Sequence, residues 1–207
     1  MNATPTKSRK SCHIAFAAVG LISLFPQMAL AEDLAEAIAK VKVAAERFQD
    51  VNVALAEGYV ADPGSHCVTA AAEGLPAELG GMGIHYLHPG LLGITATKPR
   101  VDGTGIHTDF DKPAILLYEP QADGSLLLVG AENLVFKKAW AAAGNTEPPA
   151  FAGRPWDSME DDPTTPGDEA HGFEAHYDQH VYFRGDDADA AVQPFHATIT
   201  CEHHSGH

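Results

Sequence analysis

The stretch KPAILLYEPQADGSLLLVGAENLVF, residues 112–136, decides the fold class. Residues 113–119 form one apolar run, and residues 125–136 form a second, longer one. Between them lies QADG, residues 121–124, which has the composition of a tight turn. Two apolar runs joined by such a turn are typical of a β-hairpin. We therefore predict two antiparallel strands in this stretch.

The rest of the chain predicts one long helix before the hairpin and further strands around it. Residues 32–59 repeat apolar side chains at intervals of three and four, which is helical spacing: Leu34, Ile38, Val41, Ala45 and Phe48. Further expected elements are strands at 82–87, 173–183 and 192–201, a short helix at 137–143, and an acidic, proline-rich loop at 144–172. This order predicts an α+β fold, in which the N-terminal helix packs on a curved antiparallel sheet or partial β-barrel.

The first 31 residues have the composition of an export signal. Lys7, Arg9 and Lys10 precede a short apolar run, and Ala29-Leu30-Ala31 supplies small residues at the expected cleavage position. The run is too short for a membrane span. We therefore expect cleavage after Ala31, a periplasmic or extracellular location, no membrane span after processing, and a single domain over residues 32–207.

The charge of the chain limits its partners. The formal net charge is −15, and it becomes −18 once the three basic residues of the leader are removed, because residues 1–31 contain no Asp or Glu. Such an acidic surface repels phosphate backbones, so we expect no nucleic-acid partner. Metal ions and small molecules remain compatible partners.

Two cysteines remain after cleavage, Cys67 and Cys201. An even number of cysteines in an oxidising compartment predicts a disulfide bond. The alternative is a pair of thiolate ligands on one metal ion, although neither cysteine has a second cysteine at the usual ligand spacing.

Two residues in the predicted strands are candidates for a metal site. Glu132 is the only charged residue among the alternate positions from Leu126 to Phe136, and a buried carboxylate there requires a counter-charge. The counter-charge is either a bound cation or an arginine in a salt bridge, unless Glu132 lies at the rim of a barrel. His85 lies among glycines in GMGIHY, residues 81–86, and an inward histidine is either a ligand or a hydrogen-bonded core residue.

The motif HYDQH, residues 176–180, supplies the other candidates: His176, Asp178 and His180. On a helix the two histidines would form a metal clamp, but on a strand they lie about 13 Å apart. Pairs at a spacing of two, Asp178 with either histidine, are then the better ligands. The polar face of this strand either contacts solvent or lines a polar cavity.

These candidates form one predicted metal site, made of His85, Glu132, His176, Asp178 and His180. Imidazole and carboxylate ligands together favour a divalent Zn, Cu, Fe or Mn ion over calcium. There are two weaker alternatives. His107-Thr108-Asp109, followed by His180 and Arg184, imitates the facial triad of iron oxygenases, and the His-rich tail at 202–207 could capture metal loosely.

The chain resembles a widespread family of small secreted bacterial proteins of uncharacterised function. The resemblance is carried by residues 81–86, 112–120, the strand of Glu132, and residues 176–182, together with the two cysteines. It implies export, a disulfide, and roles for His85, Glu132 and His180, but no reaction.

Three functions are compatible with these features. The first is a metal-dependent enzyme acting on a small molecule, for which the sequence offers no nucleophile or acid–base pair. The second is a non-catalytic periplasmic binder of a metal ion or small molecule. The third is an envelope interaction module in which the polar residues only cap a barrel.

Overall fold

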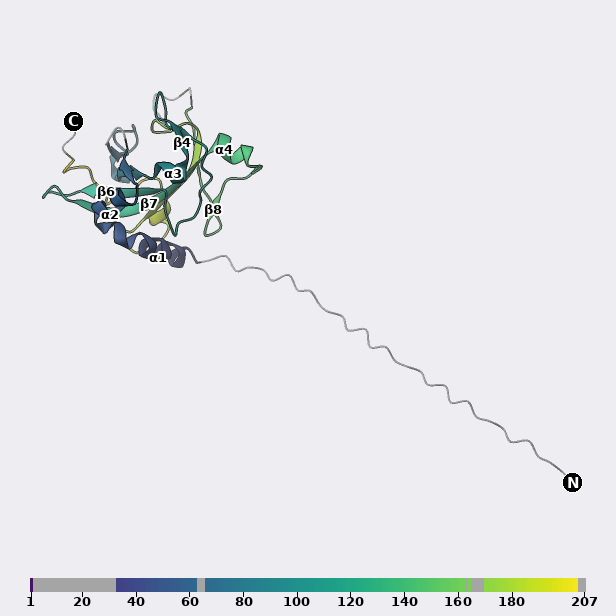
Figure 1. Ribbon diagram of the computed structural model, residues 1–207. Helices are drawn as coiled ribbons and strands as arrows, with labels where there is room; N and C mark the ends of the chain where they lie inside the picture. Colours follow the sequence, from purple (N-terminus) through teal and green to yellow (C-terminus); the bar gives the residue numbers. More distant parts are fainter. Residues whose placement is uncertain (2–32, 63–65, 163, 165–169, 205–207) are drawn as a thin grey trace. The chain divides into compact units, whose positions relative to one another are not determined.

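The computed structural model describes Met1 and residues 33–62, 66–162, 164 and 170–204 (Figure 1). The chain divides into two units, residues 1–30 and 31–207, and the secondary structure belongs to the second. The predicted export signal at residues 1–31, with its cleavage after Ala31, lies outside the described residues apart from Met1.

The second unit contains α-helices (α), short 3-10 helices (η) and strands (β). In chain order these are α1 (Leu34–Ala45), η1 (Glu46–Gln49), α2 (Val51–Ala56), β1 (Val60–Ala61), β2 (Cys67–Thr69), η2 (Ala77–Leu79), β3 (Gly81–Leu87), α3 (Pro89–Leu92), β4 (Ile94–Ala96), β5 (Asp102–Gly103), β6 (Ile115–Pro120), β7 (Leu126–Phe136), α4 (Lys137–Ala142), β8 (Ala150–Phe151), β9 (Arg154–Pro155), β10 (Asp157–Met159), β11 (His176–Tyr182) and η3 (Ala190–Val192).

One seven-stranded antiparallel sheet organises the unit. Its strand order is β1-β3-β6-β7-β11-β10, with β2 also paired to β3. The predicted hairpin is confirmed as β6 and β7, the central pair of this sheet. Within the described part of the chain the sheet does not close into a barrel. The mixture of helices with one antiparallel sheet agrees with the predicted α+β class.

The single helix predicted over residues 32–59 is wrong, because the helical segment is broken in two places. Asp33 caps the N-terminus of α1, where its carboxylate accepts hydrogen bonds from the backbone of Ala35 and Glu36. The chain then tightens into η1, and Asp50 adopts an extended conformation and caps α2. A short polar side chain that can cap a helix competes with helix continuation, and apolar spacing alone does not reveal this.

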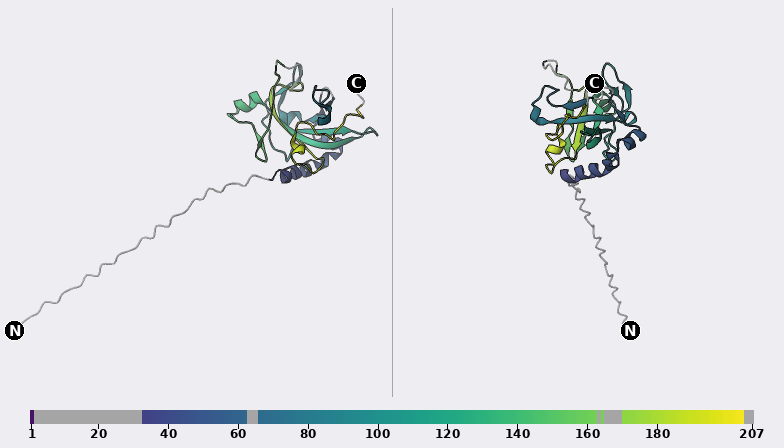
Figure 2. Two further views of the ribbon diagram at one scale, coloured as in Figure 1. Left: turned by 180° about the vertical axis from the view of Figure 1, so that it is seen from behind. Right: turned by 90° about the vertical axis from the view of Figure 1, so that its left-hand side faces the viewer.

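The N-terminal helical segment covers one face of the sheet, as Figures 1 and 2 show for α1. Ala37 and Val41 of α1 pack with apolar residues of β7 and β11, and Phe48 of η1 packs under β6. A hydrogen bond also joins the two layers, because the Tyr118 hydroxyl of β6 donates to the Phe48 carbonyl at 2.7 Å. The predicted packing of the N-terminal helical segment on the sheet therefore holds in spite of the breaks.

The opposite face of the sheet, which we call the site face, carries Leu117 of β6, Leu134 and Phe136 of β7, and Tyr182 of β11. A β-bulge changes which residues of the first half of β7 join this face. Leu117 pairs with Gly130 and Tyr118 pairs with Leu128, so Val129 has no partner on β6. Leu128 consequently packs on the helix side and Val129 on the site face. The simple alternation expected from Leu126 to Phe136 therefore holds only from Gly130 onward.

Three of the elements expected from the sequence differ in the structure. Residues 192–201 form no strand; they contain the end of η3 and one isolated bridge between His196 and Gly81. The described part of the loop at 144–172 contains β8, β9 and β10. The strand predicted from residue 173 begins at His176. Strands of two or three residues are too short to show a period in the sequence.

The predicted disulfide between Cys67 and Cys201 is present, with Cα atoms 5.7 Å apart. Cys67 lies on β2, opposite Ile84 of β3, so the bond ties the C-terminal segment to β2, the strand that pairs with the strand of His85. Among the described residues no helix is long and apolar enough to cross a membrane.

Candidate metal centre

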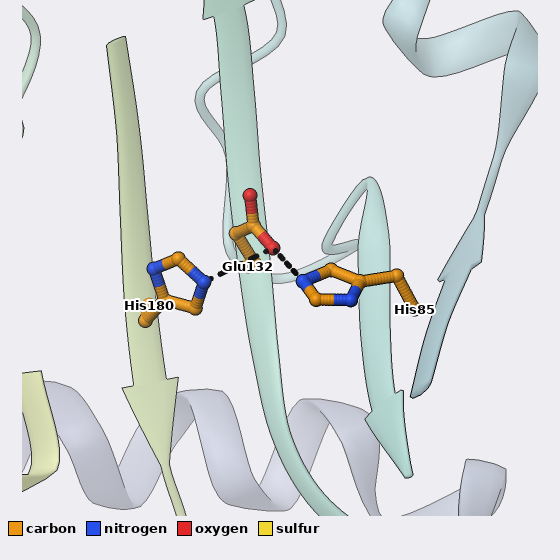
Figure 3. Close-up of side chains that lie close together, drawn as sticks. All are labelled: His85, Glu132 and His180. Carbon is orange, nitrogen blue, oxygen red and sulfur yellow. Dashed lines mark ion pairs between the residues drawn. The ribbon is translucent and has the colours of Figure 1, made fainter. Parts of the chain in front are cut away.

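The candidate site forms where three strands bring His85, Glu132 and His180 together on the site face (Figure 3). Glu132 of β7 and His180 of β11 are direct cross-strand neighbours. His85 comes from β3, which lies on the far side of β6. Since β6 separates β3 from β7, the His85 and Glu132 side chains meet across β6.

The two imidazoles approach the same carboxylate oxygen. His85 Nε2 lies 3.3 Å from Glu132 Oε2, and His180 Nε2 lies 3.4 Å from that oxygen. The three ligand atoms all lie within 4.8 Å of one another. Two ligands bonded at about 2.1 Å to one tetrahedral ion are roughly 3.4 Å apart. The two N–O separations therefore match the edges of a metal coordination sphere, and binding would bring the two nitrogens somewhat closer.

Burial of the negatively charged Glu132 destabilises the folded protein unless a cation or a proton compensates the charge. The Glu132 side chain is 4% exposed and that of His180 is 2% exposed, whereas the His85 side chain is 15% exposed. Among the described residues, Glu132 Oε2 and both ring nitrogens of His180 have no hydrogen-bond partner. Buried polar atoms are normally satisfied, so the unpaired Glu132 Oε2 and His180 Nε2, which face each other, are compatible with a cation bound between them.

The charge of the site also acts on His85. Burial lowers the pKa of its imidazole, but the nearby carboxylate of Glu132, with smaller contributions from Asp62 and Asp178, outweighs burial and raises the pKa overall. A protonated His85 is thus the alternative counter-charge for Glu132. A proton and a metal ion compete for the same nitrogen lone pair.

Asp178 and His176 lie beside this group on β11. Asp178 Oδ2 lies 3.9 Å from His180 Nδ1, the ring nitrogen that faces away from Glu132, and 3.7 Å from His176 Nε2. Of the five predicted ligands, three converge in the metal-compatible group, while Asp178 and His176 extend from it along the strand. The predicted polar face of this strand is buried from His176 to Tyr182, whereas Glu174 before it is exposed.

The sequence missed Asp157 of β10. Its backbone pairs with that of Asp178, which places both carboxylates on the same face of the sheet. Burial, and then the charge of Asp178, raise the pKa of Asp157. Asp157 lies in the stretch expected to be an irregular loop. Because β10 is only three residues long, the sequence shows no alternation of apolar and polar residues that would reveal a strand there.

In the alternative metal-binding motifs, the side chains or the backbone take part in local hydrogen bonds and turns. His107 Nε2 bonds to the Lys112 carbonyl at 2.7 Å, and Asp109 accepts a hydrogen bond from the Asp111 backbone. In the tail, the described residues 202–204 belong to a turn, and residues 205–207 lie outside the described part. No second group of three ligands is present among the residues that the structure describes.

No family model, curated protein or solved structure matches the chain. The resemblance to small secreted bacterial proteins therefore stays a prediction.

Proposed function

We propose that this protein is an exported metal-binding protein that holds one divalent transition-metal ion through His85, Glu132 and His180. The observation that carries the proposal is the convergence of two imidazole nitrogens on one buried carboxylate oxygen without hydrogen-bond partners for that oxygen or for His180. Two nitrogens and one oxygen favour Zn, Cu, Fe or Mn, and zinc is the first metal to test.

Three protein ligands leave one coordination position for water or another small ligand. Catalytic zinc sites commonly have this composition, whereas structural zinc sites usually have four protein ligands. An ion in such a site can activate water or polarise a carbonyl group. We therefore favour a metal-dependent enzyme acting on a small molecule over a non-catalytic metal or small-molecule carrier.

Export is part of the proposal. The disulfide is compatible with an oxidising compartment, and the basic and apolar composition of residues 1–31 supports removal of a leader. The test is the mass of protein recovered from the periplasm of a bacterial host. A chain that begins at Glu32 supports export, and an unprocessed cytoplasmic chain contradicts it.

The metal site is tested on untagged protein purified without chelators. We expect about one ion per chain by elemental analysis. Single variants His85→Ala, Glu132→Gln and His180→Ala should each weaken zinc affinity more than about 100-fold, since loss of a ligand costs more than the 10–100-fold loss typical of an outer residue.

His107→Ala is the matched control, because His107 is a histidine bonded to a backbone carbonyl away from the group. It should retain wild-type zinc affinity. Zinc that survives all three ligand variants but disappears when residues 202–207 are deleted would contradict the proposal and assign metal capture to the tail.

The open position separates an enzyme from a carrier. Cobalt-substituted protein should change its visible spectrum when azide is added, because an exogenous anion can enter the free position. A spectrum insensitive to azide would indicate a closed site and would favour the carrier.

A further inference from the structure

The buried carboxylate of Asp178 stands beside the candidate metal site without being one of its three convergent ligands. Its side chain is 3% exposed, and Oδ1 has no hydrogen-bond partner among the described residues. Oδ2 lies 3.9 Å from His180 Nδ1, while His180 Nε2 faces Glu132 at 3.4 Å. His180 is therefore placed between two carboxylates, one at each ring nitrogen.

A neutral imidazole carries one proton, and the nitrogen without a proton is the one that can bind a metal. If the proton resides on Nδ1, Nε2 is free to bind an ion beside Glu132. A carboxylate next to Nδ1 favours that tautomer, and a shift of about 1 Å would bring Oδ2 within hydrogen-bond range of it.

We propose that Asp178 is a positioning residue, whose carboxylate holds His180 in the Nδ1-protonated tautomer and so directs Nε2 toward the metal ion. The role differs from that of a ligand, because Asp178 acts on the metal only through His180. The consequence for metal affinity rests on the proposed function, whereas the effect on the tautomer does not.

His176 supports a charged Asp178. His176 Nδ1 lies 2.8 Å from the Glu174 carbonyl, and since a carbonyl only accepts, this nitrogen must carry a proton. Its Nε2 then faces Asp178 Oδ2 at 3.7 Å, where a second proton would make the contact an ion pair. A positive His176 would balance the buried charge of Asp178.

Tyr182 fixes the ring plane of His180 from the other side. The two rings are stacked, with centroids 5.8 Å apart and an angle of 21° between their planes. The Tyr182 hydroxyl donates to the Pro194 carbonyl at 2.7 Å, which anchors the stacking ring. Stacking restrains the plane of the imidazole but does not choose between its two tautomers, so that choice is left to the carboxylates.

The test compares Asp178→Asn with Asp157→Asn. Both variants remove one negative charge from the same face of neighbouring strands, but only Asp178 forms an ion-pair contact with His180. Nitrogen-15 NMR of the histidine rings in metal-free protein at alkaline pH reports the tautomer of His180, and a competing chelator reports zinc affinity.

We expect Asp178→Asn to lower the fraction of the Nδ1-protonated tautomer and to weaken zinc binding 10–100-fold. Asp157→Asn should leave the tautomer unchanged and zinc affinity within about threefold of wild type, because it removes charge without removing the partner of Nδ1. Asp178→Leu, which has no polar atom to accept the proton, should reproduce the tautomer change.

An unchanged His180 tautomer in Asp178→Asn would overturn the inference, as would equal losses of zinc affinity in the two Asn variants. If the leucine variant fails to fold, the near-isosteric Asp178→Asn remains decisive, with its melting temperature as the check on folding. Wild-type protein that binds no zinc would refute the proposed function, but the tautomer comparison would still decide the role of Asp178.

Discussion

Glu132 is deeply buried, and the nearest imidazole nitrogens, those of His85 and His180, lie 3.3 and 3.4 Å from its Oε2 atom. In a site that served stability alone, such a carboxylate would be satisfied by a donor or replaced by an apolar residue, because an unpaired buried charge is destabilising. Its persistence beside two histidines is the residue-level reason for placing a cation there. The same arrangement makes the protonation of His85 important.

At the residue scale we predict opposite pH trends for the metal-free and zinc-loaded protein. The groups facing His85 are Glu132, Asp62 and Asp178, with His180 on the other side of Glu132, and together they raise the His85 pKa above its ordinary value of about 6.5 despite burial. In metal-free protein, the stabilisation from protonated His85 is fully present below the unfolded pKa. It is lost as pH rises through the raised folded pKa.

Zinc binding has the opposite dependence, because it requires a deprotonated His85. Affinity should fall as pH drops through the raised pKa, and binding should release protons. Melting temperatures measured with and without zinc across this pH range test both trends. Glu132→Gln is the control, since it removes the main group that raises the pKa and should flatten both. Zinc affinity that is independent of pH would contradict a site containing His85.

Among the elements, β3 contains a glycine in a left-handed backbone conformation, which the glycines around His85 in the sequence do not by themselves reveal. Gly83 lies two residues before His85 and has a φ of +94°, a left-handed conformation that disfavours other residues. A Cβ atom at this position would lie 2.6 Å from the Tyr118 carbonyl oxygen of β6. The strand can therefore approach β6 this closely only with glycine at residue 83.

At the element scale we predict that Gly83→Ala destabilises the protein and weakens its metal site. A left-handed conformation costs a non-glycine residue about 1–2 kcal/mol, and the clash with β6 adds to that cost. Gly124→Ala is the matched control, because Gly124 has a φ of +82° with no atom near the added Cβ. Denaturant unfolding should show a larger loss for Gly83→Ala, accompanied by weaker zinc binding. If the two variants lose equal unfolding free energy, the close contact of Gly83 with β6 does not contribute to stability.

On the scale of the whole molecule, the disulfide closes a large part of the chain. Cys67 and Cys201 are 134 residues apart in sequence, so their bond restricts the unfolded chain strongly. Nearby polar contacts hold the same C-terminal segment. Glu119 accepts a hydrogen bond from the Thr200 backbone at 2.8 Å and also pairs with Arg184.

We therefore predict that the double variant Cys67→Ala/Cys201→Ala loses about 4–5 kcal/mol of unfolding free energy, the chain-entropy value for a loop of this size. Denaturant unfolding of oxidised wild type and the double variant measures the loss. A reductant should destabilise the wild type by a similar amount and leave the double variant unchanged. Wild type that is insensitive to full reduction of the bond would contradict the prediction.

The sequence by itself determined the features that depend on local pattern. The central hairpin follows from two apolar runs flanking a turn, the α+β class from a helical segment ahead of strands, and the cysteine pair from an even count. The burial of Glu132 also follows locally, because alternation from Gly130 onward places it among apolar residues. Helix breaks and short strands escaped prediction because single capping residues and two-residue pairings have no period.

Only the tertiary structure decided which polar side chains meet. The residue pattern offered five ligands and left His176 and His180 as alternatives, while the resemblance favoured His180. The register of the strands decides between them, because His180 lies directly opposite Glu132 whereas His176 lies opposite Phe136. A shift of one residue in either strand would send a side chain to the other face. His85 joins the group only because β6 lies between β3 and β7, and that strand order is set by packing over the whole sheet rather than by local spacing.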